Sequence, residues 1–305
     1  MILLSAQMGF AQPPNDGSKP RVRTMSIPIS IFTKQELKDD RLQEYVQIDR
    51  LIVKENKVEQ TILSIRSIED APLALAILIQ DDLTSDFNLQ LKDIAKFIRS
   101  LPRGSRVMVA YTRGGVSQVR QKFTDDLNKA AESLRIVVSS NSVAPRSPYD
   151  GVVDMLDRFD ALPAGRRAIL FISDGFDLSN GFNGASPGQS AELDKAILRA
   201  QRKSVAVFSI YSPSSSTADG NSRSTMFGQG SLQKLSDETG GRAFYQGSLA
   251  PVSFDPFFRD LSILLNRQFL LTYVSTHMKK GYYRLEVTST NPEIKIEHPK
   301  GYYYR

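Results

Sequence analysis

The sequence predicts a doubly wound α/β fold, with a mostly parallel sheet, joined to a small β-module. Three observations predict it. Two continuous apolar runs, Leu73–Ile79 and Ala168–Ile172, are typical of strands covered on both faces. Helical and strand-like patterns alternate through residues 71–267, which favours parallel pairing with helical crossovers. On either side of that stretch, in residues 25–70 and 268–305, the apolar period is two, so we expect both ends to contribute to one β-module.

Composition narrows the function classes. The 305 residues include no cysteine, which excludes disulfide frameworks, zinc ribbons, iron–sulfur clusters and thiol nucleophiles. No apolar run reaches the ~18 residues that would span a bilayer. The net charge is +6, but the basic residues are dispersed and form no phosphate-tracking stripe, so nucleic-acid binding is not expected.

The first residues are typical of a secretory leader. Residues 1–11 contain an apolar stretch, with Gly9 and Ala11 at −3 and −1 before Gln12, and a start annotated too far downstream would explain the missing basic region. The alternative is an untethered N-terminus. Residues 12–24 form a Pro/Gly/Asp-rich linker. We therefore expect an exported protein, periplasmic or extracellular.

The N-terminal part of the β-module is predicted to contain three strands. Met25–Phe32 alternates apolar and polar residues, and Pro28 places this strand at a sheet edge. Val46–Lys54 and Val58–Ile65 are joined at Glu55-Asn56, which predicts a hairpin.

The α/β part follows in order. Val116–Gln121 follows the preceding strand after only Arg113-Gly114-Gly115, so the two strands are expected to be antiparallel. Apolar spacing and Gly or Pro stops predict the other elements. The predicted strands are 73–79, 106–111, 167–172, 205–211 and 243–245, and the predicted helices are 91–98, 125–134, 152–159, 193–200 and 232–239.

Two polar stretches are predicted to be loops. They are Leu178–Ser190 and Ser212–Gly230, and the composition of the second favours disorder over functional mobility. A core helix follows Pro251, and the C-terminal strands are expected at 269–275, 282–288 and 293–297.

The candidate site lies where polar residues follow the buried strands. Ligands of a doubly wound sheet bind outside the carboxyl ends of its strands, at the switch point. That rule selects the segments Gln80–Ser85, Arg146–Tyr149 and Ser173–Gly175. Their carboxylates and hydroxyls are hard oxygen ligands, suited to Mg²⁺, Mn²⁺ or Ca²⁺ rather than zinc.

These segments also resemble a known family. Arg167–Asp177 (RAILFISDGFD) and Leu232–Tyr245 (LQKLSDETGGRAFY), with the acidic loop after residue 79 and the Ser147-Pro-Tyr segment, are similar to a von Willebrand factor A domain, which is Rossmann-like. Val46–Thr61, Gln268–Val274 (QFLLTYV) and Lys300–Tyr304 resemble the acidobacterial-type family related to that domain. The resemblance implies a non-enzymatic, exported protein-binding or adhesion module with a metal-ion-dependent adhesion site.

The resemblance implies a degenerate metal site. The family pattern is Asp-x-Ser-x-Ser, a Thr and an Asp, and its positions fall on Gln80, Asp82, Thr84, Ser147 and Asp174. Gln80 replaces the first carboxylate, so Mg²⁺ or Mn²⁺ would bind weakly or in altered geometry. A register shifted by one residue offers Asp81 and Ser85 instead. The competing interpretation is a relic in which these side chains cap turns and helices and no metal binds.

Other functions fit the sequence poorly. No Gly-rich phosphate loop follows the first buried strand, and no G-x-S-x-G segment is present, so neither a nucleotide enzyme nor a serine hydrolase is predicted. The remaining alternatives are metal-independent protein binding through the Ser-rich loop or the β-module, and salt-sensitive binding to anionic envelope surfaces.

Overall fold

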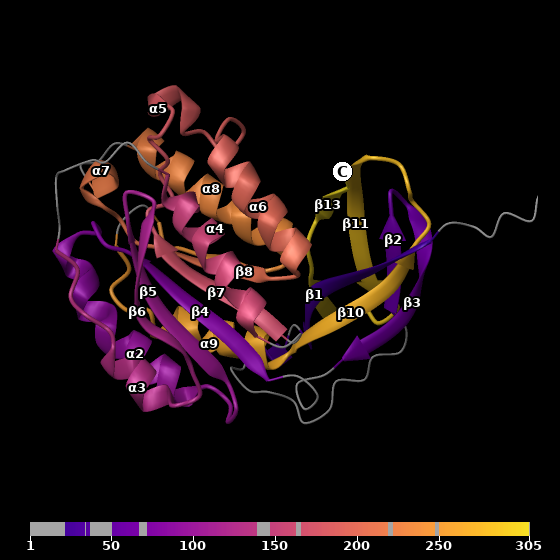
Figure 1. Cartoon of the computed structure of the whole chain (residues 1–305), viewed down its shortest axis with the longest axis horizontal. Coiled ribbons are helices and arrows are strands. Elements are labelled where there is room, and N and C mark those ends of the chain that lie inside the picture. Colours follow the sequence, from indigo (N-terminus) through magenta and orange to yellow (C-terminus); the bar gives the residue numbers. More distant parts are fainter. Residues whose placement is uncertain are drawn as a thin grey trace, which may run out of the picture.

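The chain forms two sheets that lie side by side (Figure 1). The computed structural model describes residues 22–33, 35–36, 51–66, 72–138, 147–162, 166–218, 222–247 and 250–304. The predicted leader, most of the linker and Val46–Arg50 lie outside the described residues, and the division of the chain at residues 71 and 267 stays a prediction.

One sheet, here called the mixed sheet, has six strands among the described residues. They are β4 (Leu73–Gln80), β5 (Arg106–Arg113), β6 (Val116–Thr124), β7 (Arg166–Ser173), β8 (Ala206–Tyr211) and β9 (Ala243–Phe244). Their spatial order is β6-β5-β4-β7-β8-β9, so numbered along the chain it is 3-2-1-4-5-6, the order of a doubly wound sheet. β6 pairs antiparallel with β5, as its short link predicts, and the other pairs are parallel. The sheet is therefore mixed rather than wholly parallel.

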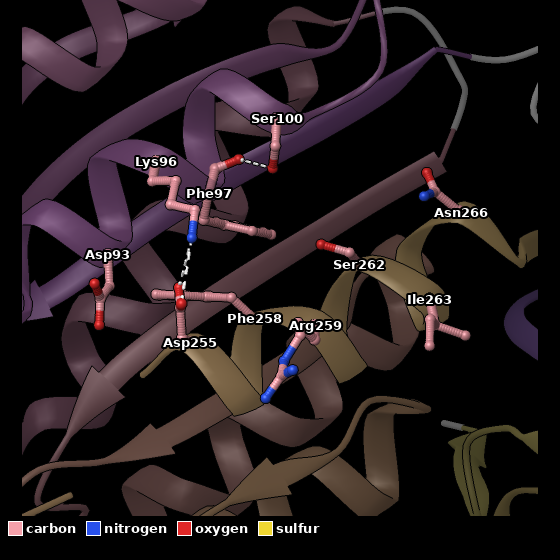
Figure 2. Close-up of a pocket in the computed structure, with 10 residues that line it drawn as sticks. All are labelled: Asp93, Lys96, Phe97, Ser100, Asp255, Phe258, Arg259, Ser262, Ile263 and Asn266. Atoms are coloured by element: carbon pink, nitrogen blue, oxygen red, sulfur yellow. Dashed lines mark hydrogen bonds and ion pairs between the residues drawn. The ribbon is translucent and has the colours of Figure 1, made fainter. Parts of the chain in front are cut away.

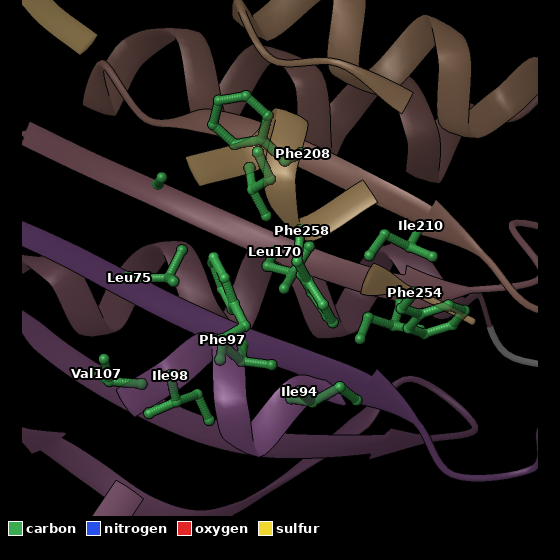
Figure 3. Close-up of a cluster of buried hydrophobic side chains, with 14 of the residues drawn as sticks. Leu75, Ile94, Phe97, Ile98, Val107, Leu170, Phe208, Ile210, Phe254 and Phe258 are labelled. Atoms are coloured by element: carbon green, nitrogen blue, oxygen red, sulfur yellow. The ribbon is translucent and has the colours of Figure 1, made fainter. Parts of the chain in front are cut away.

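Helices cover both faces of the mixed sheet because each central strand is apolar on both sides. Along β4, Leu75, Ile77 and Ile79 face one core, and Ala74, Ala76 and Leu78 face the other. The first core is filled from α2, α3 and α9, and Figure 3 shows Phe97 and Phe258 within it. The second core is filled from α4, α6 and α8. The helix bounds are η1 (Ser85–Gln90), α2 (Leu91–Ser100), α3 (Leu127–Glu132), α4 (Pro148–Arg158), η2 (Phe159–Ala161), α5 (Gly181–Gly184), α6 (Ala191–Lys203), α7 (Ser215–Ala218), α8 (Ser222–Thr239) and α9 (Asp255–Asn266).

The second sheet, here called the antiparallel sheet, combines strands from both ends of the chain. They are β1 (Arg23–Thr33), β2 (Leu51–Glu55), β3 (Val58–Arg66), β10 (Gln268–Ser275), β11 (Gly281–Ser289), β12 (Ile294–Glu297) and β13 (Gly301–Tyr304). Their order is β12-β1-β10-β3-β2-β11-β13. The β2–β3 turn lies at Asn56-Lys57, one residue later than predicted, and both residues have positive φ (46° and 72°), as a type I′ turn requires.

The prediction that β1 is an edge strand is wrong. β1 lies between β10 and β12, but β12 pairs only with residues 30–33 of β1. Pro28 falls in the stretch that has β10 as its sole described partner, so its missing N–H disrupts no second ladder.

A buried carboxylate organises the interior of the antiparallel sheet. Glu55 is fully buried and accepts hydrogen bonds from Tyr273 Oη (2.7 Å), Tyr302 Oη (2.6 Å) and Ser275 Oγ (2.7 Å), and its Oε2 lies 2.8 Å from His277 Nδ1. Burial raises the pKa of Glu55, but these four partners outweigh it and hold the pKa below its usual value. The charge is therefore satisfied inside the sheet.

The prediction that residues 212–230 form a disordered loop is wrong. α7 lies within this stretch, and α8 begins at Ser222, ten residues before the predicted start at Leu232. The Ser/Gly-rich first half of α8 lacks the large apolar stripe that predicts a helix. Small residues are required there instead, because a Cβ on Gly228 would lie 2.0 Å from the backbone oxygen of Asp174. Among the described helices, none is long and apolar enough to span a membrane.

We expect Gly228→Ala to destabilise the fold by roughly 1–3 kcal/mol, because the added methyl group would overlap the Asp174 carbonyl oxygen and a helix-propensity gain of about 1 kcal/mol does not offset that. Gly230→Ala in the same helix is the matched control, since its methyl group would meet the Pro187 ring at 3.0 Å. Urea denaturation measures both. Equal stabilities for the two variants would contradict the close contact.

Candidate functional site

The carboxyl ends of β4 and β7 are joined by a side-chain amide. Gln80 is the last residue of β4, and Ser173 is the last residue of the neighbouring strand β7. Gln80 Oε1 accepts hydrogen bonds from Ser173 Oγ and from the backbone N–H of Asp174 (3.2 Å). All three residues are buried. Gln80 thus fixes the start of the Asp174 loop at the switch point of the mixed sheet.

Asp174 is a buried carboxylate whose two oxygens both accept hydrogen bonds. Oδ1 accepts from the backbone N–H of Phe176 (3.0 Å), and Oδ2 accepts from Ser214 Oγ. Burial raises the pKa of Asp174 to about 6, and the negative charge of nearby Asp82 adds to the rise, while the bonds from Ser214 and Phe176 oppose it. Two carboxylates therefore lie close enough at the switch point to repel each other.

Asp82 and Thr84 carry the unsatisfied atoms of the cluster. Asp82 Oδ1 and Thr84 Oγ1 are buried and have no hydrogen-bond partner among the described residues. Their loop is held in place by its backbone, because the Thr84 N–H donates to Pro213 O (2.9 Å) and Leu83 forms a bridge with Ser214. A buried acceptor without a donor is costly, which marks these oxygens as candidates for an external cation or donor.

Ser147 takes a capping role. Its Oγ accepts from the backbone N–H of Tyr149 (3.2 Å) at the start of α4, and the residue is fully buried. Tyr149 Oη donates to the backbone oxygen of Gly175 (2.7 Å), so the loop before α4 lies against the loop after β7.

The shifted-register residues are placed differently from the main set. Asp81 forms a two-point ion pair with Arg135 (2.7 and 2.8 Å), and the Arg135 guanidinium lies 4.2 Å from the centre of the Tyr111 ring. Ser85 is exposed at the start of η1. Asp81 therefore already has a cation, supplied by the protein.

Several residues that take part in the site are not among those expected from the sequence. Ser214 follows β8, and its bond to Asp174 could have been anticipated by applying the carboxyl-end rule to β8 as well. Thr112 Oγ1 at the end of β5 is a further buried oxygen without a partner, and Thr112 pairs with Gln80 across the sheet. Nothing in the sequence predicts the Gly228 contact or the pairing of Arg135 with Asp81.

The donor set suits a hard cation such as Mg²⁺ or Mn²⁺ better than zinc or copper. Asp82 and Thr84 offer oxygens that no protein donor uses, with Asp174 supplying a second negative charge nearby. Among the described residues there is no group of three or more His, Cys, Asp or Glu side chains placed so that it could hold a metal ion, so any ion here would depend on hydroxyl oxygens and water as well. The residues present fit an oxygen-ligated ion that keeps several waters.

Comparison with known proteins gives only remote likenesses. No family model matches the chain, and no curated protein matches it. Similar solved structures include an aerotolerance-related membrane protein from Bacteroides fragilis (14% identity, covering 64% of this chain and 98% of that one, TM-score 0.44). The SpRpn10 VWA domain is 14% identical over 62% of this chain and 93% of that one, with a TM-score of 0.38. The manganese-loaded TRAP protein of Plasmodium vivax is 9% identical over 82% of this chain and 97% of that one, with a TM-score of 0.41.

We expect the stability of the protein to fall relative to that of Asp174→Asn as the pH rises from about 4 to about 7. The folded-state pKa of about 6 lies above the ordinary 3.8, so the protonated carboxyl stabilises the fold at low pH and this contribution is lost as the pH rises through 6. Denaturation of both proteins at pH 4.5 and 7.5 measures the difference. A stability difference that does not change with pH would contradict the raised pKa.

The strand order, the polar cluster at the switch point and the sequence segments described above agree with one another. The α/β part of this chain has a doubly wound fold with one antiparallel edge strand, the architecture expected from its sequence resemblance to von Willebrand A domains.

Proposed function

We propose that this chain is a non-catalytic, exported protein-binding module that holds its partner at the carboxyl edge of the mixed sheet through a divalent cation. The observation that supports this most directly is the pair of buried, unpartnered oxygens, Asp82 Oδ1 and Thr84 Oγ1, beside the carboxylate of Asp174.

The ligand set proposed here is smaller than the one that the sequence pattern implies. Asp82 and Thr84 would hold Mg²⁺ or Mn²⁺, and Asp174 would contribute charge. Gln80 and Ser147 already accept hydrogen bonds from neighbouring loops and serve as braces. When bound, the cation would supply the positive charge that a carboxylate of the partner protein completes. With a neutral amide at position 80, the affinity for the ion is expected to be weak.

The chemistry of the cluster favours binding over catalysis. The titratable side chains named in it are carboxylates, and Asp174 is locked between Ser214 and Phe176. His277 and His298 both lie in the antiparallel sheet region, away from the switch point. Ser214 donates to the Asp174 carboxylate, but both residues are only 2% exposed, so this hydroxyl–carboxylate pair is closed to a substrate.

We expect Mn²⁺, and more weakly Mg²⁺, to raise the melting temperature of the protein at pH 7.5 and to give a measurable heat in calorimetric titration. Asp82→Asn should lower the Mn²⁺ affinity at least about tenfold, because it removes a charged ligand. Asp86→Asn, which changes an exposed carboxylate four residues further along the same loop, is the matched control and should bind as the wild type does.

Two results would overturn the metal proposal. One is the absence of both heat and stabilisation in the wild type, and the other is unchanged Mn²⁺ binding in Asp82→Asn.

A further inference from the structure

We propose a second site, for a phosphate-type oxyanion, in the pocket between the antiparallel sheet and α6. The pocket has a volume of about 380 Å³ and is lined by residues of β1, of α6 and of β13. Volumes of this size suit small ligands, and such pockets favour the junction between layers or domains.

The charge of the lining indicates an anion. Arg23 of β1 and Arg202 of α6 both line the pocket, and the lining among the described residues includes no Asp or Glu. Hydroxyl-bearing side chains make up much of the remainder, among them Ser204 and Tyr302. Two arginines without a carboxylate form an electropositive recess to which oxyanions are attracted.

Arg23 is held in position by aromatic rings rather than by an acid. Its guanidinium carbon lies 3.8 Å from the centre of the Tyr304 ring and 4.9 Å from that of Tyr302, and its Nη2 donates to Tyr302 Oη (2.5 Å). Its Nε is buried without a hydrogen-bond partner. The stacked rings and the bond to Tyr302 fix the plane of the guanidinium, whose remaining N–H groups can donate to an oxyanion.

The nearby acid does not cancel this charge by direct pairing. Tyr302 Oη accepts from Arg23 and donates to Glu55, whose carboxylate has four partners in the antiparallel sheet. Glu55 does not line the pocket. Tyr302 therefore links Arg23 to Glu55 only indirectly, and Arg23 has no ion-pair partner among the described residues.

Arg202 of α6 is the second basic side chain in the lining. Its side chain is exposed near the end of α6 and makes no hydrogen bond or ion pair with any described residue. Its neighbour Lys203, by contrast, is paired with Asp157 and Asp160. Arg202 is thus free to close on a ligand that Arg23 holds.

Another cavity shows why this pocket is selective. The cavity between α2 and α9 has a volume of about 320 Å³, and Figure 2 shows Lys96 and Asp255 facing each other on its rim at 3.2 Å, with Asp93 beside them. The lining of that cavity carries two basic side chains, Lys96 and Arg259, and two acidic ones, so its formal charges balance and the same oxyanion finds no net attraction.

The proposal is tested at low ionic strength with two kinds of probe. Binding of inorganic phosphate and of glycerol phosphate is measured by ³¹P NMR and by the shift in melting temperature. Binding to vesicles with and without phosphatidylglycerol is measured by co-sedimentation. Arg202→Gln should weaken binding roughly tenfold, which is the loss of one charge-assisted contact, and it should not alter stability because Arg202 has no described partner. Arg120→Gln, at an exposed arginine on β6, is the matched control and should bind within twofold of the wild type.

The site is supported if the wild type and the control bind one of these probes and Arg202→Gln binds it more weakly. Binding of soluble phosphate indicates a free phosphate ligand, and binding only of phosphatidylglycerol vesicles indicates a lipid headgroup. Arg23→Lys should also weaken binding, since it keeps the charge but loses the planar guanidinium and its fixed donors. No response to any probe in the wild type, or equal responses in the wild type and Arg202→Gln, would overturn the proposal. Because the pocket does not involve Asp82, its failure is independent of the cation site.

Discussion

The side-chain amide of Gln80 is the interaction on which the arrangement of the site depends. It accepts from Ser173 and from the backbone N–H of Asp174, so it ties together the two central strands at the point where their crossovers diverge. A carboxylate at this position would add a third negative charge to Asp82 and Asp174, in a place where burial already raises the pKa of Asp174 to about 6. The neutral amide keeps the same hydrogen bonds without that repulsion. The cluster can therefore fold without a cation, while Asp82 and Thr84 keep oxygens that a cation would satisfy.

The loop held by Gln80 is enclosed from three directions. Tyr149 donates to the backbone oxygen of Gly175, Ser214 donates to Asp174, and α8 lies so close that only glycine fits at position 228. Gly175 itself has a positive φ of 66° and has no room for a side chain, since a Cβ there would lie 2.4 Å from Gly228 O. The opposite end of α8 reaches the antiparallel sheet, where Lys300 pairs with Asp237 and Tyr282 donates to Glu238 (3.0 Å). One helix thus contacts both the candidate cation site and the sheet formed by the chain ends.

Much of this architecture could be predicted from the sequence, because the signals were local. The apolar run Leu73–Ile79 is continuous since β4 is covered on both faces, and the two residues between β5 and β6 are too few for a parallel crossover. The start of α8 could not be predicted, because its first half is held by a close backbone contact that small residues permit and that leaves no apolar periodicity. The ion pair of Asp81 with Arg135 could not be predicted either, because Arg135 lies 54 residues further along the chain. For the candidate site, the residue types and their positions at the strand ends were predictable. Their hydrogen bonds were not, because they depend on the folded loops: Gln80 and Ser147 are bonded to neighbouring backbone, whereas Asp82 Oδ1 and Thr84 Oγ1 have no described partner.

The most direct test of this account is a crystal structure of the protein grown or soaked with Mn²⁺, with anomalous diffraction used to locate the ion. We predict an anomalous peak at coordinating distance from Asp82 Oδ1 and Thr84 Oγ1, with Gln80 still hydrogen-bonded to Ser173 and Asp174. The absence of a peak there, with both oxygens instead hydrogen-bonded to the protein or to water, would contradict it.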